Sequence, residues 1–136
     1  MDILVIEDSD SIARMIEALV AGRGHAVRTA VSGAVGVDLA RERTPDVVLL
    51  DWSLAGSLSG AEICERLRRD DTTCDTSILV FGEADDEAKS RALDAGAIAY
   101  YTKPYSPLAV LKEIEGLRAR SSGRMRARKS GRPLPK

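Results

Sequence analysis

Five short apolar runs alternate with longer amphipathic segments between residues 3 and 117, and this alternation constrains the fold more than any other feature. Each run has the length and apolar character of a buried β-strand. The runs are Ile3–Ile6, Ala26–Ala30, Val47–Leu50, Ile78–Phe81 and Ile98–Tyr101. Strands that alternate with helices predict an α/β protein with a parallel sheet, because each parallel connection must cross over one face of the sheet.

The segments between the runs carry signals for helix ends. Ser9 or Asp10 is suited to cap the first helix, and Gly22 lies near its end. The pair Ser106-Pro107 is suited to start the last helix, because proline is preset for the first helical turn. The predicted helices run from Ser9 to Gly22, from Ser32 to Arg43, onward from Gly60, from Asp85 to Gly96 and from Ser106 to Leu117. We therefore expect five strand–helix pairs in one domain.

The composition indicates a cytoplasmic protein. No apolar run approaches the roughly 20 residues that span a membrane, and the chain opens on a strand-like run with no signal-peptide pattern. The two cysteines, Cys64 and Cys74, have neither a disulfide pattern nor metal-ligand spacing, so we expect reduced thiols.

The charge is divided unevenly along the chain. All 21 acidic residues precede Gly116, whereas eight of the 20 basic residues follow it. The last stretch, SSGRMRARKSGRPLPK, has no apolar periodicity. We therefore expect a domain over residues 1–119 and a flexible basic tail over 120–136. The tail is interpreted as a solvated extension or a stub of linker, with binding to nucleic acid or an acidic partner as the alternative.

Charged side chains follow three of the five predicted strands. Glu7 and Asp8 follow the first, Asp51 the third and Lys103 the fifth. The carboxyl ends of parallel strands meet at one edge of a sheet, so these groups are expected to gather there. A single aspartate after a strand is most often a turn residue, but three carboxylates together require a cation. Oxygen ligands favour Mg²⁺, and the lysine can hold a phosphoryl oxygen.

The motifs ILVIEDS, VVLLDW and AGAIAYYTKP together resemble the receiver domain of response regulators, the phospho-acceptor half of two-component signalling. The chain resembles the stand-alone chemotaxis type. The resemblance covers residues 1 to about 119. It implies a flavodoxin-like (βα)5 fold, a doubly wound parallel sheet with strand order 2-1-3-4-5. It also implies a phosphodonor, which is a sensor histidine kinase or a histidine phosphotransfer protein, and a downstream protein partner. That partner would bind the face made by the fourth helix, the fifth strand and the fifth helix.

The resemblance also assigns roles in a magnesium and phosphoryl site. Asp51 matches the aspartate that is phosphorylated, and Asp8 matches the direct Mg²⁺ ligand. Glu7 matches the partner that acts through a water, and Ser53 the position whose backbone carbonyl completes the metal site. Lys103, which the family follows with a cis proline, matches the lysine that binds the phosphoryl group.

The residues that switch the surface depart from the family pattern. Tyr100 matches the aromatic side chain that changes rotamer on activation. The family has threonine or serine and then a small residue after the fourth strand, whereas this chain has Gly82 and Glu83. Gly82 offers no hydroxyl to a phosphoryl oxygen, and Glu83 adds negative charge. Phosphorylation is therefore expected to move the surface around Tyr100 only weakly.

Three functions differ in how well they fit these residues. The first is a stand-alone receiver that accepts a phosphoryl group on Asp51, catalyses only its own phosphorylation and dephosphorylation, and signals through its own surface. The alternative is a phosphorylation-independent pseudo-receiver that acts as an interaction module, which Gly82 and Glu83 favour. A magnesium-dependent phosphohydrolase is disfavoured, because it would need a catalytic acid where Ser53 stands.

Overall fold

The computed structural model describes residues 1–54 and 56–117. Nine elements follow one another in the order β1 (Asp2–Ile6), α1 (Asp10–Ala21), β2 (Ala26–Ala30), α2 (Gly33–Glu42), β3 (Val47–Asp51), α3 (Gly60–Arg69), β4 (Ser77–Gly82), α4 (Asp86–Asp94) and β5 (Ala99–Thr102). A further helix covers 107–117. Met1–Tyr105 form one compact unit, and a second begins at Ser106. The predicted tail over 120–136 lies outside the described residues.

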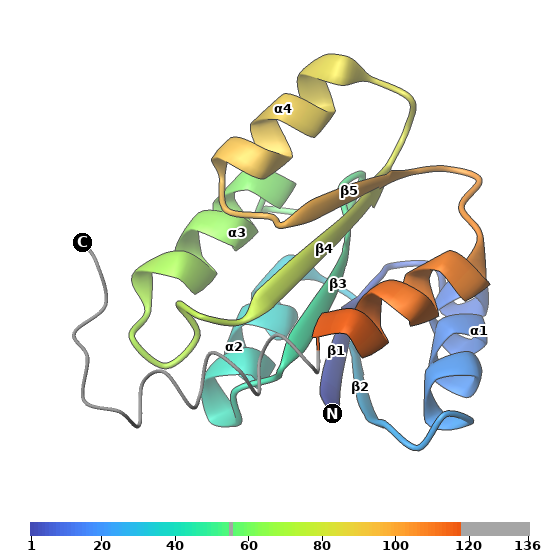
Figure 1. The fold of residues 1–136 in the computed structure, drawn as a ribbon. Helices are drawn as coiled ribbons and strands as arrows, with labels where there is room; N and C mark the ends of the chain where they lie inside the picture. The colour runs from blue at the N-terminus through green and yellow to red at the C-terminus, as the bar shows by residue number, and fades with distance from the viewer. Residues whose placement is uncertain (55, 118–136) are drawn as a thin grey trace. The chain divides into compact units, whose positions relative to one another are not determined.

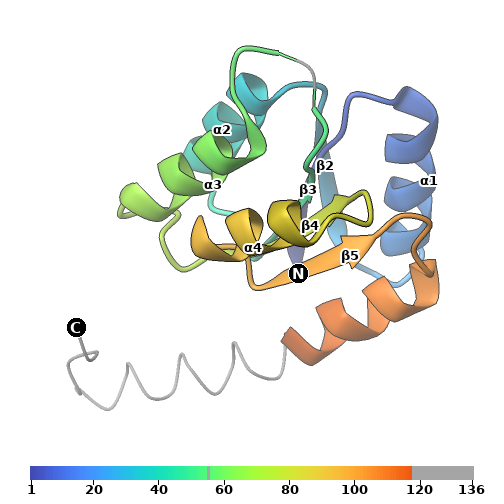
Figure 2. The same cartoon turned by 90° about the horizontal axis from the view of Figure 1, so that it is seen from above.

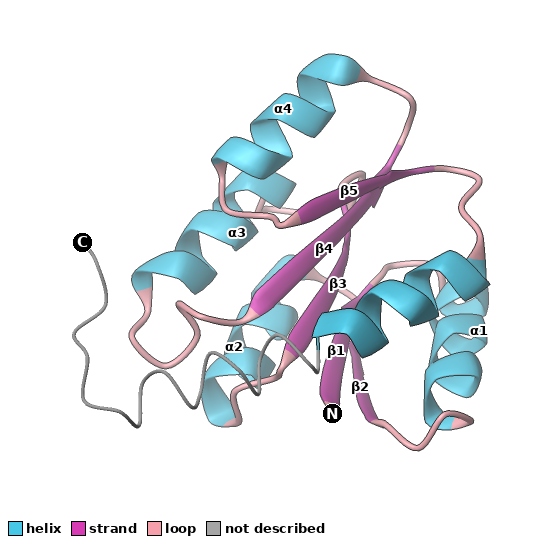
Figure 3. Ribbon diagram, in the orientation of Figure 1, coloured by secondary structure: helices cyan, strands magenta, loops and turns pink. Residues whose placement is uncertain are grey.

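The five strands form one parallel sheet in the order β2-β1-β3-β4-β5, as the family resemblance implied (Figures 1 and 3). Within the first unit, α1 lies on one face of the sheet, and α2 and α3 lie on the other (Figure 2). Right-handed crossovers explain this division. The chain moves outward from β1 to β2 and then in the opposite direction along the sheet from β3 to β5, and this reversal places α2 and α3 on the opposite face from α1. The arrangement confirms the predicted α/β class and its flavodoxin-like topology.

The centre of the sheet forms the core. All five residues of β3 are buried, including Asp51 at its end, and Ile3 to Ile6 of β1 are also buried. Apolar runs without alternation are expected for strands that are covered on both faces. No strand begins or ends more than one residue away from its predicted bound. One prediction was wrong at this level: Ile98 precedes β5 and is 45% exposed, whereas β5 begins at Ala99.

The helix ends follow the predicted chemistry. The Ser9 side chain accepts a hydrogen bond from the Ile12 backbone N–H at the start of α1, and Gly22 caps its end. A capping box, in which Ser59 and Glu62 exchange hydrogen bonds, starts α3. The predicted apolar face of α1 is only partly buried, since Met15 is 50% exposed.

The second unit contains the last helix, which starts where the Ser106-Pro107 signal placed it. The Ser106 hydroxyl accepts a hydrogen bond from the Ala109 backbone N–H. Four apolar side chains of this helix are buried, namely Val110, Leu111, Ile114 and Leu117. Among the described residues, no helix has the length and apolar character needed to cross a membrane.

Candidate functional site

Three carboxylates meet at the carboxyl edge of the sheet. Glu7 and Asp8 directly follow β1, and Asp51 is the last residue of β3. Because β1 and β3 are paired neighbours, their ends bring these residues together. One carboxylate oxygen from each of the three lies within 4.8 Å of the others. The predicted gathering at this edge is therefore confirmed.

Asp51 is held in place from two directions. Its side chain is 6% exposed, and its Oδ1 accepts a hydrogen bond of 3.0 Å from the Ser53 backbone N–H. The Lys103 Nζ lies 3.0 Å from the same oxygen. Lys103 follows β5, and its peptide bond to Pro104 is cis, as the family resemblance implied. A buried strand thus presents a carboxylate whose orientation is set by one backbone donor and one cation.

The crowding of the carboxylates shows in the pKa of Glu7. This pKa lies at about 7 instead of its ordinary value of 4.5, and burial of the carboxyl is the largest cause. The charge of Asp51 and side-chain hydrogen bonds to Asp51 and Asp8 contribute to the same rise, whereas the hydrogen bond from the Ser9 backbone N–H opposes it. Without a cation, a proton therefore partly neutralises the cluster near pH 7.

A divalent cation fits this donor set. The three groups offer only carboxylate oxygens, which Mg²⁺ prefers, and the pKa of Glu7 is raised by burial and, to a smaller extent, by the neighbouring charge of Asp51. Glu7 is buried, whereas Asp8 is exposed, so the cluster opens to solvent on the Asp8 side. The predicted part of the Ser53 carbonyl in this site stays a prediction.

Lys103 carries a stable positive charge beside Asp51. Burial by itself would lower the pKa of Lys103, but the hydrogen bond from its Nζ to Asp51 and the charges of Asp51, Glu7 and Glu83 outweigh burial. Its pKa therefore lies above the ordinary value. A cation that remains charged across the physiological range is suited to a phosphoryl oxygen.

The end of β4 is tied to the segments on both sides of it. The Phe81 carbonyl accepts a hydrogen bond of 2.8 Å from the Trp52 N–H, and the Gly82 carbonyl accepts one of 2.8 Å from the Lys103 N–H. The Tyr100 hydroxyl donates a 2.7 Å hydrogen bond to the next carbonyl, that of Glu83. β4 therefore links Trp52, the residue after Asp51, to Lys103.

Two aromatic residues at this edge had no place in the predicted site. The Tyr105 ring packs against Phe81 in a tilted arrangement with ring centroids 4.6 Å apart, and burial together with the charges of Glu7 and Asp51 raises the pKa of Tyr105. Tyr105 stands two residues after Lys103, and this spacing could have indicated from the sequence that Tyr105 lies near the site. The Trp52 ring lies against Gly60 at the start of α3, where it would block any added side chain. Trp52 is partly buried and also packs against the main hydrophobic cluster.

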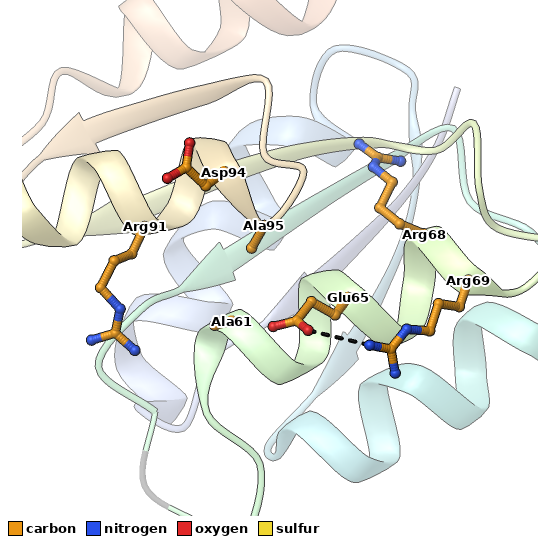
Figure 4. Close-up of a pocket in the computed structure, with 7 residues that line it drawn as sticks. All are labelled: Ala61, Glu65, Arg68, Arg69, Arg91, Asp94 and Ala95. Carbon is orange, nitrogen blue, oxygen red and sulfur yellow. Dashed lines mark hydrogen bonds and ion pairs between the residues drawn. The ribbon is translucent and has the colours of Figure 1, made fainter. Parts of the chain in front are cut away.

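Two hollows lie near these elements. One, of about 280 Å³, includes the two residues that follow Asp51 and is lined by Trp52, Ser53, Glu83, Asp85, Glu87, Ala88, Arg91 and Tyr100. The other, of about 500 Å³, lies between α3 and α4 (Figure 4). In this second hollow Arg69 pairs with Glu65 on the same helix, and Arg68 donates hydrogen bonds to the carbonyls of Gly96 and Cys74. These arginines have structural partners, and the second hollow contains none of the predicted site residues.

The sequence of this chain is similar to those of known proteins. Residues 3–115 match the family model described as response regulator receiver domain. The chain is 40% identical over 102 residues to the transcriptional regulatory protein AfsQ1 of Streptomyces coelicolor. This alignment covers 75% of this chain and 44% of that protein. It is 35% identical over 124 residues to the phosphate regulon transcriptional regulatory protein PhoB of Pseudomonas aeruginosa, covering 88% of this chain and 52% of that protein. The chain thus spans about half the length of the curated relatives that it matches.

Solved structures agree with the sequence matches. A putative response regulator from Chloroflexus aurantiacus superposes with a TM-score of 0.80 at 30% identity, covering 87% of this chain and 97% of that one. The chemotaxis protein CheY4 of Vibrio cholerae superposes with a TM-score of 0.78 at 26% identity, covering 85% of this chain and 97% of that one. Both neighbours have the fold seen here.

Proposed function

The chain belongs to the family of response regulator receiver domains, and on that premise we propose that it accepts a phosphoryl group on Asp51 from a phosphohistidine of a sensor histidine kinase or a histidine phosphotransfer protein. Receiver domains are signalling phospho-acceptors rather than classical enzymes. One observation supports the proposal most strongly: the buried Asp51 carboxylate lies among Glu7, Asp8 and Lys103 at the edge of the sheet.

The proposed chemistry is a transfer between two protein side chains. A carboxylate oxygen of Asp51 attacks the phosphorus of the phosphohistidine, the P–N bond breaks, and its electron pair returns to the imidazole nitrogen. The Lys103 ammonium, 3.0 Å from Asp51 Oδ1, is close enough to bind an oxygen of the arriving group. The product is an aspartyl phosphate, which water later hydrolyses.

Magnesium is the proposed cofactor. Asp8, Asp51 and the Ser53 backbone carbonyl would hold the ion, with Glu7 acting through a water. When bound, the ion offsets the negative charge that phosphoryl oxygens bring to three carboxylates. Loss of the proton from Glu7, whose pKa is about 7, would accompany binding.

The proposed output is a protein surface. Leu93 on α4 and Ile98 before β5 are 41% and 45% exposed, and both lie in the region expected to bind a downstream partner. The curated relatives are described as transcriptional regulators, so control of transcription through a further domain or a partner is one form that this output could take. Signalling as a stand-alone domain is the other.

The test is the intact mass of the protein after incubation with acetyl phosphate and Mg²⁺. The wild type is expected to gain one phosphoryl group, which is stable in acid and labile in base. Asp51→Asn should gain none, whereas Asp94→Asn on α4 should be labelled like the wild type. Equal labelling of the wild type and Asp51→Asn would reject Asp51 as the acceptor.

A phosphorylation-independent interaction module remains the second candidate. The specific observation in its favour is that Gly82 and Glu83 stand where receivers have a hydroxyl and then a small residue. The two candidates differ in one measurement. A partner of the module would bind Asp51→Asn and the wild type equally, with or without acetyl phosphate, whereas a partner of a phospho-acceptor would distinguish them.

A further inference from the structure

The Tyr100 ring occupies the space that a side chain at position 82 would need. A Cβ added to Gly82 would stand 2.8 Å from Tyr100 Cζ and still closer to the hydroxyl oxygen. Gly82 lies at the end of β4 and Tyr100 in β5, directly across from Val80 in the strand pairing. The two residues are therefore complementary: one lacks a side chain where the other places its phenol.

The phenol is held by polar and apolar contacts at once. Its hydroxyl donates a 2.7 Å hydrogen bond to the Glu83 carbonyl, and its ring packs against the main hydrophobic cluster. Together with the bonds to Trp52 and Lys103, this contact holds the carbonyls of three successive residues, Phe81, Gly82 and Glu83. The junction between β4 and α4 is thus fastened to β3 and β5.

Displacing the ring would carry two penalties. The Glu83 carbonyl would lose its donor, and the space over Gly82 would be left without a side chain to fill it. Neither the donor nor the acceptor of this hydrogen bond is a charged group, so a phosphoryl group on Asp51 does not directly compete for it. Gly82 itself offers no side-chain group that could respond to the added charge.

We propose that Gly82 and Tyr100 form a fixed pair, in which the phenol replaces the missing side chain and keeps the junction between β4 and α4 in one arrangement whether or not Asp51 is phosphorylated. Tyr100 is then a positioning residue that acts through the main chain of β4. The part that concerns phosphorylation rests on the proposed function, whereas the pairing itself does not. A signal from Asp51 would have to leave the site without turning Tyr100.

The first test follows the ring directly. The chain has three tyrosines, so fluorotyrosine labelling gives a simple ¹⁹F NMR spectrum in which Tyr100→Phe identifies the Tyr100 signal. We expect this signal to stay in place when acetyl phosphate and Mg²⁺ are added, while intact mass on the same sample confirms labelling of Asp51. Movement of the signal as the phosphorylated fraction grows would overturn the proposal. Absence of labelling would instead reject the proposed function and leave the decision on the pair to the second test.

The second test needs no phosphorylation. Gly82 is not among the glycines with positive φ, so the backbone accepts alanine and the effect of Gly82→Ala comes from the contact with the ring. Gly82→Ala is expected to shift the Tyr100 signal toward that of free fluorotyrosine and to lower the melting temperature. In a Tyr100→Val background, which removes the ring, Gly82→Ala should lower it little or not at all. Equal losses in the two backgrounds, or an unmoved Tyr100 signal in Gly82→Ala, would show that the two residues are not coupled.

Discussion

The Lys103 ammonium lies 3.0 Å from the Asp51 carboxylate, although 52 positions separate the two residues in the chain. The pair joins the ends of β5 and β3, which are separated in the sheet by β4. Oδ1 of Asp51 also accepts the Ser53 N–H, so a single oxygen receives both donors. The Asp51 carboxylate is therefore held in one orientation by these two contacts.

Removing the ammonium should slow phosphorylation. Lys103→Met keeps most of the side-chain length but loses a charged hydrogen bond, worth about 1.5–3 kcal/mol, so the labelling rate with acetyl phosphate should fall about 10- to 100-fold. The rate is read from intact mass over time. Lys89→Met on α4 is the control and should label at the wild-type rate; a similar rate in Lys103→Met would exclude the lysine from the reaction.

Magnesium binding should depend on Asp8. Trp52 directly follows the acceptor, so its fluorescence is expected to report a titration with millimolar Mg²⁺. Asp8→Ala should weaken the affinity tenfold or more, which corresponds to about 1.4 kcal/mol. The control is Asp38→Ala on α2, which removes a charge outside the cluster. An unchanged titration curve in Asp8→Ala would remove Asp8 from the metal site.

The raised pKa of Glu7 predicts how the stability of the metal-free protein depends on pH. Glu7 has a pKa of about 7 in the fold and near 4.5 when unfolded. Between these values the folded state holds more protons, so its contribution to stability is full below about pH 4.5 and is lost as the pH rises through about 7. In EDTA, the melting temperature of the wild type should fall over this range relative to that of Glu7→Gln.

Magnesium should oppose the same trend. The ion competes with the proton on Glu7, so the rise in melting temperature on adding Mg²⁺ should be larger at pH 8 than at pH 6. Glu7→Gln has no such proton to release, and its response should be nearly equal at the two values. Equal responses in the wild type would contradict the coupling between the proton and the ion.

Glu83 should slow the reaction with anionic donors. Its side chain is exposed, and its charge acts on Lys103. Glu83→Gln is expected to raise the labelling rate with acetyl phosphate about 1.5- to 5-fold, a gain of the size that exposed charges provide. The gain should shrink in high salt, because mobile ions screen exposed charges. Glu65→Gln on α3 serves as the charge-matched control; a gain that persists in high salt would argue for a steric cause.

Much of the fold and of the candidate site was determined by sequence alone, because local chemistry encodes it. Apolar runs placed β1 and β3 within one residue of their observed bounds, and capping residues such as Ser9 placed helix starts. A parallel sheet brings its carboxyl ends together, so the motifs by themselves predict that Glu7, Asp8 and Asp51 meet at one edge, as they do in the structure.

Only the tertiary structure shows which side chains contact one another across neighbouring strands. The sequence marked Gly82 as a missing hydroxyl, but only the pairing of β4 with β5 shows that the Tyr100 ring fills that space. The pKa of Glu7 and the contact between the Tyr105 and Phe81 rings likewise depend on distances across the sheet. Burial, electrostatic interaction and side-chain volume are properties of neighbours in space, and no local pattern in the chain records them.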